Sequence, residues 1–82
     1  MADVPIVRYF AAARAAAGVS EESLDAATLD ELLDEAGRRH GERLTLVLKS
    51  CSFLVDGLAR HDRTVALAAQ STVDILPPFA GG

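Results

Sequence analysis

The sequence contains only one cysteine, Cys51, among its 82 residues. A single thiol forms no intrachain disulfide and cannot supply the paired cysteines of a CxxC zinc or thioredoxin-type motif. We therefore expect a protein of the reducing cytoplasm. A metal site that combines Cys51 with His40 and His61 is disfavoured, because the spacing of these residues matches no standard ligand pattern.

Long apolar runs are also absent, although hydrophobic residues make up 50% of the chain. No stretch approaches the roughly 20 residues that a membrane span requires. The first five residues include Asp3 and lack the basic and apolar segments of a secretory signal, so neither membrane association nor export is predicted. The length suits one small domain and is too short for two.

An excess of basic residues is missing as well, since the formal net charge is -4. Nucleic-acid binding requires a positive surface and is therefore not expected. The sequence has no P-loop, GxGxxG, GxSxG or HExxH motif, and so small a domain offers little volume for a deep pocket. An enzyme that acts alone is not predicted.

Strands are predicted where β-branched and aromatic residues concentrate. Segment 4–10 alternates, with Ile6 and Arg8 on one side and Val7 and Tyr9 on the other. The polar segment 20–25 predicts an edge strand that pairs with it as a hairpin. Three more strands are expected at 52–55, at 58–60 after an Asp56-Gly57 turn, and at 72–76, where Val73 and Ile75 share one face.

One main helix is predicted over residues 28–41. Thr28 and Glu31 form a capping-box pattern, Gly41 ends the helix, and the apolar face consists of Leu29, Leu32, Leu33 and Ala36. Gly37 costs about 1 kcal/mol relative to alanine in a helix interior, so either the helix packs closely there or it ends early.

Charged residues of this helix predict ion pairs between Asp34 and Arg38 and between Glu35 and Arg39. The acidic residues form a solvated face, with a docking surface for basic partner residues as the alternative. His40 is expected to act as a cation at the helix end.

Two shorter segments are ambiguous. Residues 11–17 are rich in alanine but few, so a loop with one helical turn ending at Gly18 is expected. Leu44, Val47, Leu48 and Cys51 have helical spacing, which predicts a single turn or a short 3₁₀ piece, with Cys51 as a small buried apolar residue. Together the elements predict an α+β roll, one sheet wrapped over one helix.

The carboxyl-terminal tail follows the final strand. Pro77-Pro78 stops the ladder of hydrogen bonds, and Gly81 and Gly82 have no side chains to fix their shape. A terminal carboxylate is inert to nucleophiles and needs activation before acyl chemistry, yet a side-chain-free thread can carry it into a narrow cleft. The alternative is a passive chain end.

The chain resembles the family of molybdopterin synthase small subunits, which are ubiquitin-like sulfur carriers related to the carrier of the thiamine pathway. The similarity extends over nearly the whole chain, through VRYFAAARAAAG, TLDELLDEA, VDG and LPPFAGG. Two features depart from the family pattern. Ala69-Gln70-Ser71 stands where the family often has a Gly-Asp-type turn, and Gly37 is atypical within the helix.

The resemblance implies a β-grasp domain over 1–76, with a mixed sheet packed on one main helix, and an extended tail over 77–82. It implies that an E1-like activating enzyme uses ATP to adenylate Gly82, and that a sulfur donor then converts it to a thiocarboxylate. The resemblance also implies that no cofactor is bound permanently. Gly81 and Ala80 would thread into partner active sites, and the residues that dock would be Leu76, Pro77, Pro78 and Phe79.

The large subunit of molybdopterin synthase is then the partner that receives the tail and performs the catalysis. Sulfur would pass from Gly82 to cyclic pyranopterin monophosphate in molybdenum cofactor biosynthesis. Three alternatives stay open: a carrier for cysteine or thiamine biosynthesis, a ubiquitin-like modifier that forms isopeptide bonds, and a small binding domain with an inert tail.

Overall fold

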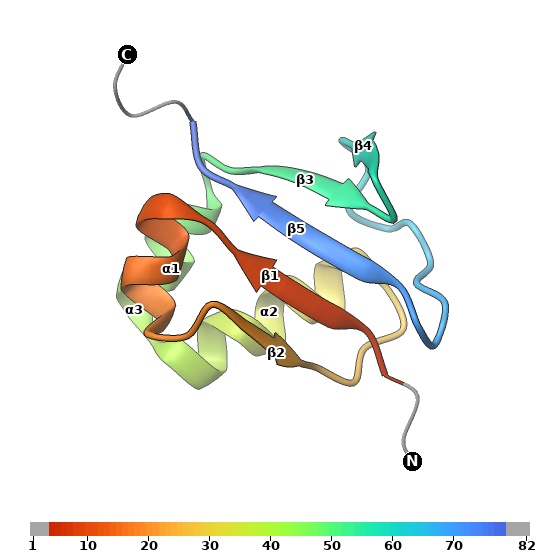
Figure 1. Ribbon diagram of the computed structural model, residues 1–82, viewed down its shortest axis with the longest axis horizontal. Helices are drawn as coiled ribbons and strands as arrows, with labels where there is room; N and C mark the ends of the chain where they lie inside the picture. Colours follow the sequence, from red (N-terminus) through yellow and green to blue (C-terminus); the bar gives the residue numbers. More distant parts are fainter. Residues whose placement is uncertain (1–3, 79–82) are drawn as a thin grey trace.

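Five strands form one mixed sheet in the order β2-β1-β5-β3-β4 (Figure 1). The computed structural model describes residues 4–78. All five predicted strands are present, and their bounds are β1 (Ile6–Tyr9), β2 (Glu21–Ser23), β3 (Ser52–Val55), β4 (Leu58–Arg60) and β5 (Thr72–Leu76).

The centre of the sheet is the parallel pair of β1 and β5, in which Val7 lies opposite Val73 and Tyr9 opposite Ile75. β2 is the edge strand next to β1, and β3 pairs antiparallel with both β5 and β4. The last strand of the chain is therefore held between the first and the third. Parallel neighbours require a crossover connection, and the helices supply it.

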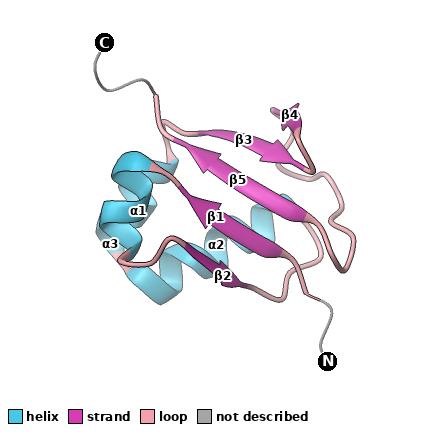
Figure 2. Cartoon of the chain, viewed as in Figure 1, coloured by secondary structure: helices cyan, strands magenta, loops and turns pink. Residues whose placement is uncertain are grey.

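Three helices cover one face of this sheet: α1 (Ala11–Ala17), α2 (Leu29–His40) and α3 (Glu42–Leu48). Figure 2 shows the helices gathered on one side, with α2 passing behind β1 and β2 in this view. Alternate strand residues point toward the helices, so Val7, Tyr9, Val73 and Ile75 are buried in one core with the apolar face of α2. The opposite face of the sheet has no helix within the described residues.

The predicted main helix is confirmed as α2, with both of its ends as expected. The Thr28 hydroxyl accepts a hydrogen bond from the Glu31 N–H at 3.2 Å, and the Glu31 carboxylate accepts one from the Ala27 N–H at 3.1 Å. Gly41 follows the last helical residue with φ +96° and donates its N–H to the Gly37 carbonyl at 2.8 Å. The helix thus continues past Gly37, and close packing explains that residue.

Both shorter helical predictions are wrong, because each segment forms two turns of α-helix. α1 buries Ala13 and Ala17 in the core and ends at Gly18, whose positive φ of 80° lets its N–H reach the Arg14 carbonyl. α3 buries Leu44 and Leu48. Helices this short are marginal in isolation, so tertiary packing supplies the stability that propensity cannot.

The two predicted ion pairs of α2 are also wrong. Arg38 instead pairs with Glu35, three residues earlier, and Arg39 extends to Glu22 on β2 at 3.2 Å. Neighbours three apart on a helix are as close as neighbours four apart. Arg39 finds its acid on the edge strand, which a pattern within one helix cannot show.

The Asp56-Gly57 turn between β3 and β4 is confirmed. Both residues have positive φ, 51° and 85°, as a two-residue hairpin turn requires. Asp56 also accepts a hydrogen bond from the Thr72 N–H at 2.9 Å, which fixes the turn to the start of β5.

None of the three helices in residues 4–78 has the length and apolar character of a membrane span.

Candidate functional site

The predicted site begins where β5 leaves the sheet, at the upper left of Figure 1. Leu76 is the last residue of the strand and is half-buried, Pro77 is half-buried, and Pro78 is exposed. A proline has no N–H to continue a ladder, so the sheet ends at this point. The other predicted site residues, Phe79, Ala80, Gly81 and Gly82, lie outside the described residues.

The surroundings of this exit come from the first strand. Tyr9 and Ile75 are the last paired residues of β1 and β5, and Phe10 donates its N–H to the Ile75 carbonyl at 3.3 Å. Phe10 is 39% exposed despite its size. Strand alternation places Phe10 and Leu76 on the uncovered face of the sheet.

An ion pair lies in the middle of the same face, between β1 and β5. The Arg8 guanidinium donates to both oxygens of Asp74, from Nε to Oδ1 at 2.6 Å and from Nη2 to Oδ2 at 2.9 Å. This hydrogen bonding to Asp74 raises the pKa of Arg8 above its ordinary value. The guanidinium carbon of Arg8 also lies 5.8 Å from the centre of the Phe10 ring, within cation–π range.

Apolar side chains flank the ion pair. Ile6 is 37% exposed, and Leu54 and Leu76 are half-buried. Strand register sets Leu54 opposite Asp74, and Ile6 opposite Thr72. We call the side chains that share this uncovered face the open face and define it by Ile6, Arg8, Phe10, Leu54, Asp74 and Leu76. A partly apolar surface beside a chain exit is suited to binding a second protein.

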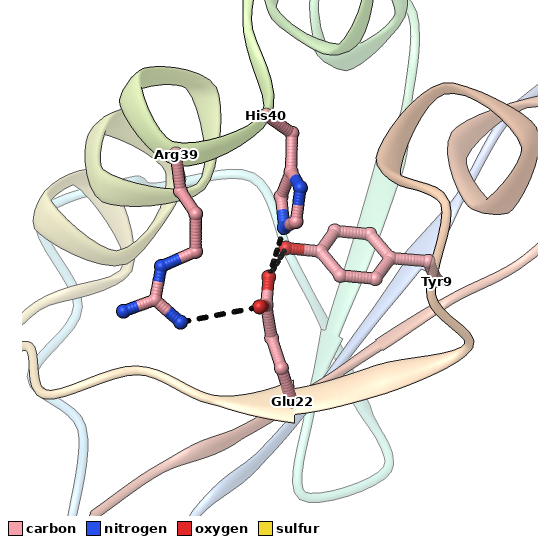
Figure 3. A network of polar contacts seen from close by, with 4 residues as sticks. All are labelled: Tyr9, Glu22, Arg39 and His40. Carbon is pink, nitrogen blue, oxygen red and sulfur yellow. Dashed lines mark hydrogen bonds and ion pairs between the residues drawn. The ribbon is translucent and has the colours of Figure 1, made fainter.

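A second polar cluster connects the edge strand to the helices (Figure 3). Oε2 of Glu22 accepts a hydrogen bond from the Tyr9 hydroxyl at 2.6 Å and lies 2.5 Å from Nε2 of His40. The other carboxylate oxygen accepts from Arg39 at 3.2 Å. The rings of Tyr9 and His40 meet edge to face, with centres 5.8 Å apart. We call these four residues the Glu22 cluster.

Electrostatics in the Glu22 cluster favour an ionised glutamate and a neutral tyrosine. Burial would raise the pKa of Glu22, but hydrogen bonds from Tyr9, His40 and Arg39 outweigh burial and hold this pKa below its ordinary value. Burial and the Glu22 carboxylate raise the pKa of Tyr9 far above its ordinary value. The cluster thus fixes β2 to the end of α2, on the covered side of the sheet and away from the open face.

The remaining candidates lie apart from the chain exit. Cys51 is half-buried, packs against the core and donates its thiol to the Val47 carbonyl at 3.2 Å, and burial raises its pKa. His61 is exposed. Within residues 4–78, no group of three or more His, Cys, Asp or Glu side chains is placed to hold a metal ion.

Three of the four acidic residues of α2 make polar contacts within the chain. Glu31 caps the helix, Glu35 pairs with Arg38, and Asp30 lies 3.4 Å from the Arg63 guanidinium. Asp30, Glu31 and Asp34 are exposed, as expected of a solvated face.

Sequence reasoning missed the Arg8–Asp74 pair and the Glu22 cluster. The sequence did contain a signal for the Arg8–Asp74 pair. β1 and β5 each contain one charged residue, and the two charges are opposite. The partners are 66 positions apart, however, and their pairing depends on β1 and β5 being adjacent. Glu22 gave no signal of its own in a polar edge strand.

The protein has a ubiquitin-like β-grasp fold, as the resemblance implied. The order of the strands, the helices on one face of the sheet and the central position of the last strand, β5, define this fold. The ThiS family matches residues 7–82, and the chain belongs to this family. Proteins of this type are sulfur carriers or ubiquitin-like modifiers. No curated protein matches the sequence.

Three of the similar solved structures match over nearly their full length. Small archaeal modifier protein 1 from Haloferax volcanii is 25% identical, with a TM-score of 0.82, and the match covers 95% of this chain and 98% of that chain. The protein of the same name from Methanosarcina acetivorans is 20% identical, with a TM-score of 0.84 and coverage of 100% and 99%. The third structure is a complex of subunits 1 and 2 of molybdopterin-converting factor from Helicobacter pylori, at 23% identity, a TM-score of 0.70 and coverage of 96% and 99%.

Proposed function

We propose that this chain is the small subunit of molybdopterin synthase and that the carboxylate of Gly82 carries the sulfur. The observation that most strongly supports a sulfur-carrying tail is the family match, which continues past Pro77-Pro78 to residue 82. The similar Helicobacter pylori structure is a two-subunit complex of a molybdopterin-converting factor, which supports a large subunit as the partner.

The chemistry of the proposal needs little from the carrier itself. An E1-like enzyme joins the Gly82 carboxylate to the adenylyl group of ATP and releases pyrophosphate, which makes the carbonyl carbon electrophilic. Sulfur at the oxidation level of sulfide then attacks that carbon, AMP leaves, and a thiocarboxylate results. Its sulfur is a soft nucleophile that would attack cyclic pyranopterin monophosphate in the large subunit. Water would then cleave the acyl–sulfur bond, which returns the Gly82 carboxylate and leaves the sulfur on the pterin, and the acid–base catalysis of these steps would reside in the large subunit.

The described part of the chain supports the delivery step. β5 is held by neighbours on both sides, so the direction in which it leaves the sheet is fixed up to Pro77. In the proposal, Phe10 and Leu76 contact the large subunit beside the exit, together with Pro77, Pro78 and Phe79. Ala80 and Gly81 extend into its active site, where residues with little or no side chain fit a narrow channel. A fully extended arm from Phe79 to Gly82 spans at most about 14 Å.

Intact-mass spectrometry tests the proposal. The chain is incubated with the organism's own E1-like enzyme, ATP and a sulfur donor, and its carboxyl-terminal peptide is then fragmented. We expect replacement of one oxygen by sulfur at Gly82, no replacement when ATP is omitted, and formation of molybdopterin when the large subunit and cyclic pyranopterin monophosphate are added. Sulfur replacement without molybdopterin formation would assign the carrier to another pathway, such as cysteine or thiamine biosynthesis.

A protein modifier is the second candidate, because two of the similar structures are small archaeal modifier proteins with TM-scores of 0.82 and 0.84. In that case the activated Gly82 carbonyl would be attacked by lysine amines, and isopeptide bonds would form. Digestion of cell lysate and a search for lysines that carry the tail's terminal residues separates the two functions, since a carrier alone leaves no such adducts.

A further inference from the structure

The Arg8–Asp74 ion pair is an unusual element in an otherwise partly apolar open face. The Asp74 side chain is only 11% exposed, whereas that of Arg8 is 47% exposed and covers it. By strand register, Glu21, Arg8, Asp74, Leu54 and Ala59 form one row across all five strands. The pair therefore stands at the centre of the surface that a docked partner would cover.

The guanidinium has hydrogen-bonding capacity that the chain does not use in this pair. Arginine has five N–H donors, and the two bonds to Asp74 use one on Nε and one on Nη2. The donors on Nη1 and the second one on Nη2 remain. Asp74 on one side and the Phe10 ring on the other hold the group in a fixed position, so a partner meets a preorganised donor.

Docking a partner on this face removes water from the ion pair. Burial of a charged pair costs free energy unless additional hydrogen bonds satisfy its remaining donors. A partner with a purely apolar surface would leave the Nη1 donors unsatisfied, whereas one with an acceptor oxygen at that point would satisfy them. An arrangement of this kind discriminates between partners more than it adds affinity.

We propose that Arg8 determines partner specificity on the open face, by donating the N–H groups that Asp74 does not bind to an acceptor oxygen of the synthase large subunit. Asp74 is the positioning residue that holds Arg8. This inference rests on the proposed function, since it takes the large subunit as the occupant of the open face. It adds the requirement that the large subunit presents a carbonyl or carboxylate oxygen opposite the β1–β5 junction, surrounded by apolar contacts to Ile6, Leu54 and Leu76.

The test measures binding of the chain to the large subunit from the same organism, by titration calorimetry. The informative variant is Arg8→Leu combined with Asp74→Val. The introduced leucine and valine are compatible with a β-strand, and removal of both charges leaves neither one unpaired. Arg8→Lys keeps the charge but loses the planar fork. Arg43→Leu on α3 is the control, since it removes one exposed positive charge on the other side of the molecule. Urea unfolding establishes that each variant is folded.

We expect the double variant to bind at least about tenfold more weakly, the lysine variant to lie between it and the wild type, and the control to match the wild type. If the folded double variant binds its own large subunit as tightly as the wild type does, Arg8 is a structural ion-pair residue and the inference is wrong. If the wild type itself does not bind, the proposed function fails and the inference with it.

Discussion

The backbone of Gly37 in α2 lies against the side chain of Thr45 in α3, where a Cβ atom added to Gly37 would stand 2.6 Å from the Thr45 hydroxyl oxygen. The next nearest atom, Cβ of Thr45, would be at 3.7 Å, an ordinary contact. The residue that looked discordant within the helix therefore lies at a close contact between the two helices, where an alanine side chain does not fit without a shift.

Gly37→Ala is expected to destabilise the fold even though alanine favours helices. Overpacking costs about 1–3 kcal/mol, and the better helix propensity returns about 1 kcal/mol. In a Thr45→Ala background, which removes the hydroxyl, the same change should stabilise the protein instead. Urea unfolding of the four proteins in this cycle measures both effects, and a stabilising Gly37→Ala in the wild-type background would refute the steric explanation.

Glu22→Gln is expected to lower the free energy of unfolding by about 2 kcal/mol near pH 7, since Gln lacks the charge that Tyr9, His40 and Arg39 bind. The pKa of Glu22 is depressed in the folded state, so its stabilising effect is complete above the unfolded pKa of about 4.3 and is lost as the pH falls through the folded value. The difference between variant and wild type should therefore shrink toward zero in acid.

Glu21→Gln is the matched control for this comparison, because Glu21 precedes Glu22 on the same strand and is exposed. Its effect on the free energy of unfolding at pH 7 should be smaller than that of Glu22→Gln, because Glu21 is exposed. A constant gap between Glu22→Gln and wild type from neutral pH down to pH 3 would contradict the assignment of an ionised Glu22.

Tyr9 should resist ionisation for as long as the protein is folded. Its pKa is strongly raised, so the neutral form is favoured in the folded state and stability falls as the pH rises above about 10, where an unfolded tyrosine ionises. Tyr9 is the only tyrosine and the chain has no tryptophan, so ultraviolet absorbance reports on this phenol alone. Phenolate absorbance should appear together with the loss of helical circular dichroism. Phenolate formation at an ordinary pKa in a folded protein would show that Tyr9 is not buried against Glu22 in solution.

Cys51 should react slowly with iodoacetamide in the native protein and rapidly in urea, because burial raises its pKa and covers the sulfur. Mass spectrometry of timed samples gives both rates. Equal rates would mean that the thiol is accessible, and Cys51 would then have to be excluded as an alternative site of sulfur attachment.

The fold could be predicted from the sequence where local signals agree with tertiary packing. α2 begins at the capping box of Thr28 and Glu31 and ends at Gly41, whose positive φ suits glycine. The Asp56-Gly57 turn closes the β3–β4 hairpin. Residues 11–17 and the segment around Leu44 were underestimated, because their helical state depends on burial in a core that a local pattern does not reveal.

The site divides in the same way. Pro77 and Leu76 mark the end of the last strand in sequence and in structure alike. The partner of Arg8 is set by which strands are neighbours, and Glu22 gains its importance from α2, whose end meets β2 only in the folded chain. Contacts between segments that are distant in the sequence depend on the tertiary fold, and local sequence patterns do not predict them.

Deletion of Gly82, combined with mass analysis of sulfur transfer, tests whether Gly82 is the residue that carries the sulfur. The claim predicts that the shortened chain unfolds at the same urea concentration as the full chain, but gains no thiocarboxylate and supports no molybdopterin synthesis with E1-like enzyme, ATP, sulfur donor and large subunit. Cys51→Ala is the control and should acquire sulfur normally, by replacement of an oxygen and not by addition of a whole sulfur atom. Molybdopterin synthesis by the chain without Gly82, or sulfur found only on Cys51, would contradict the account.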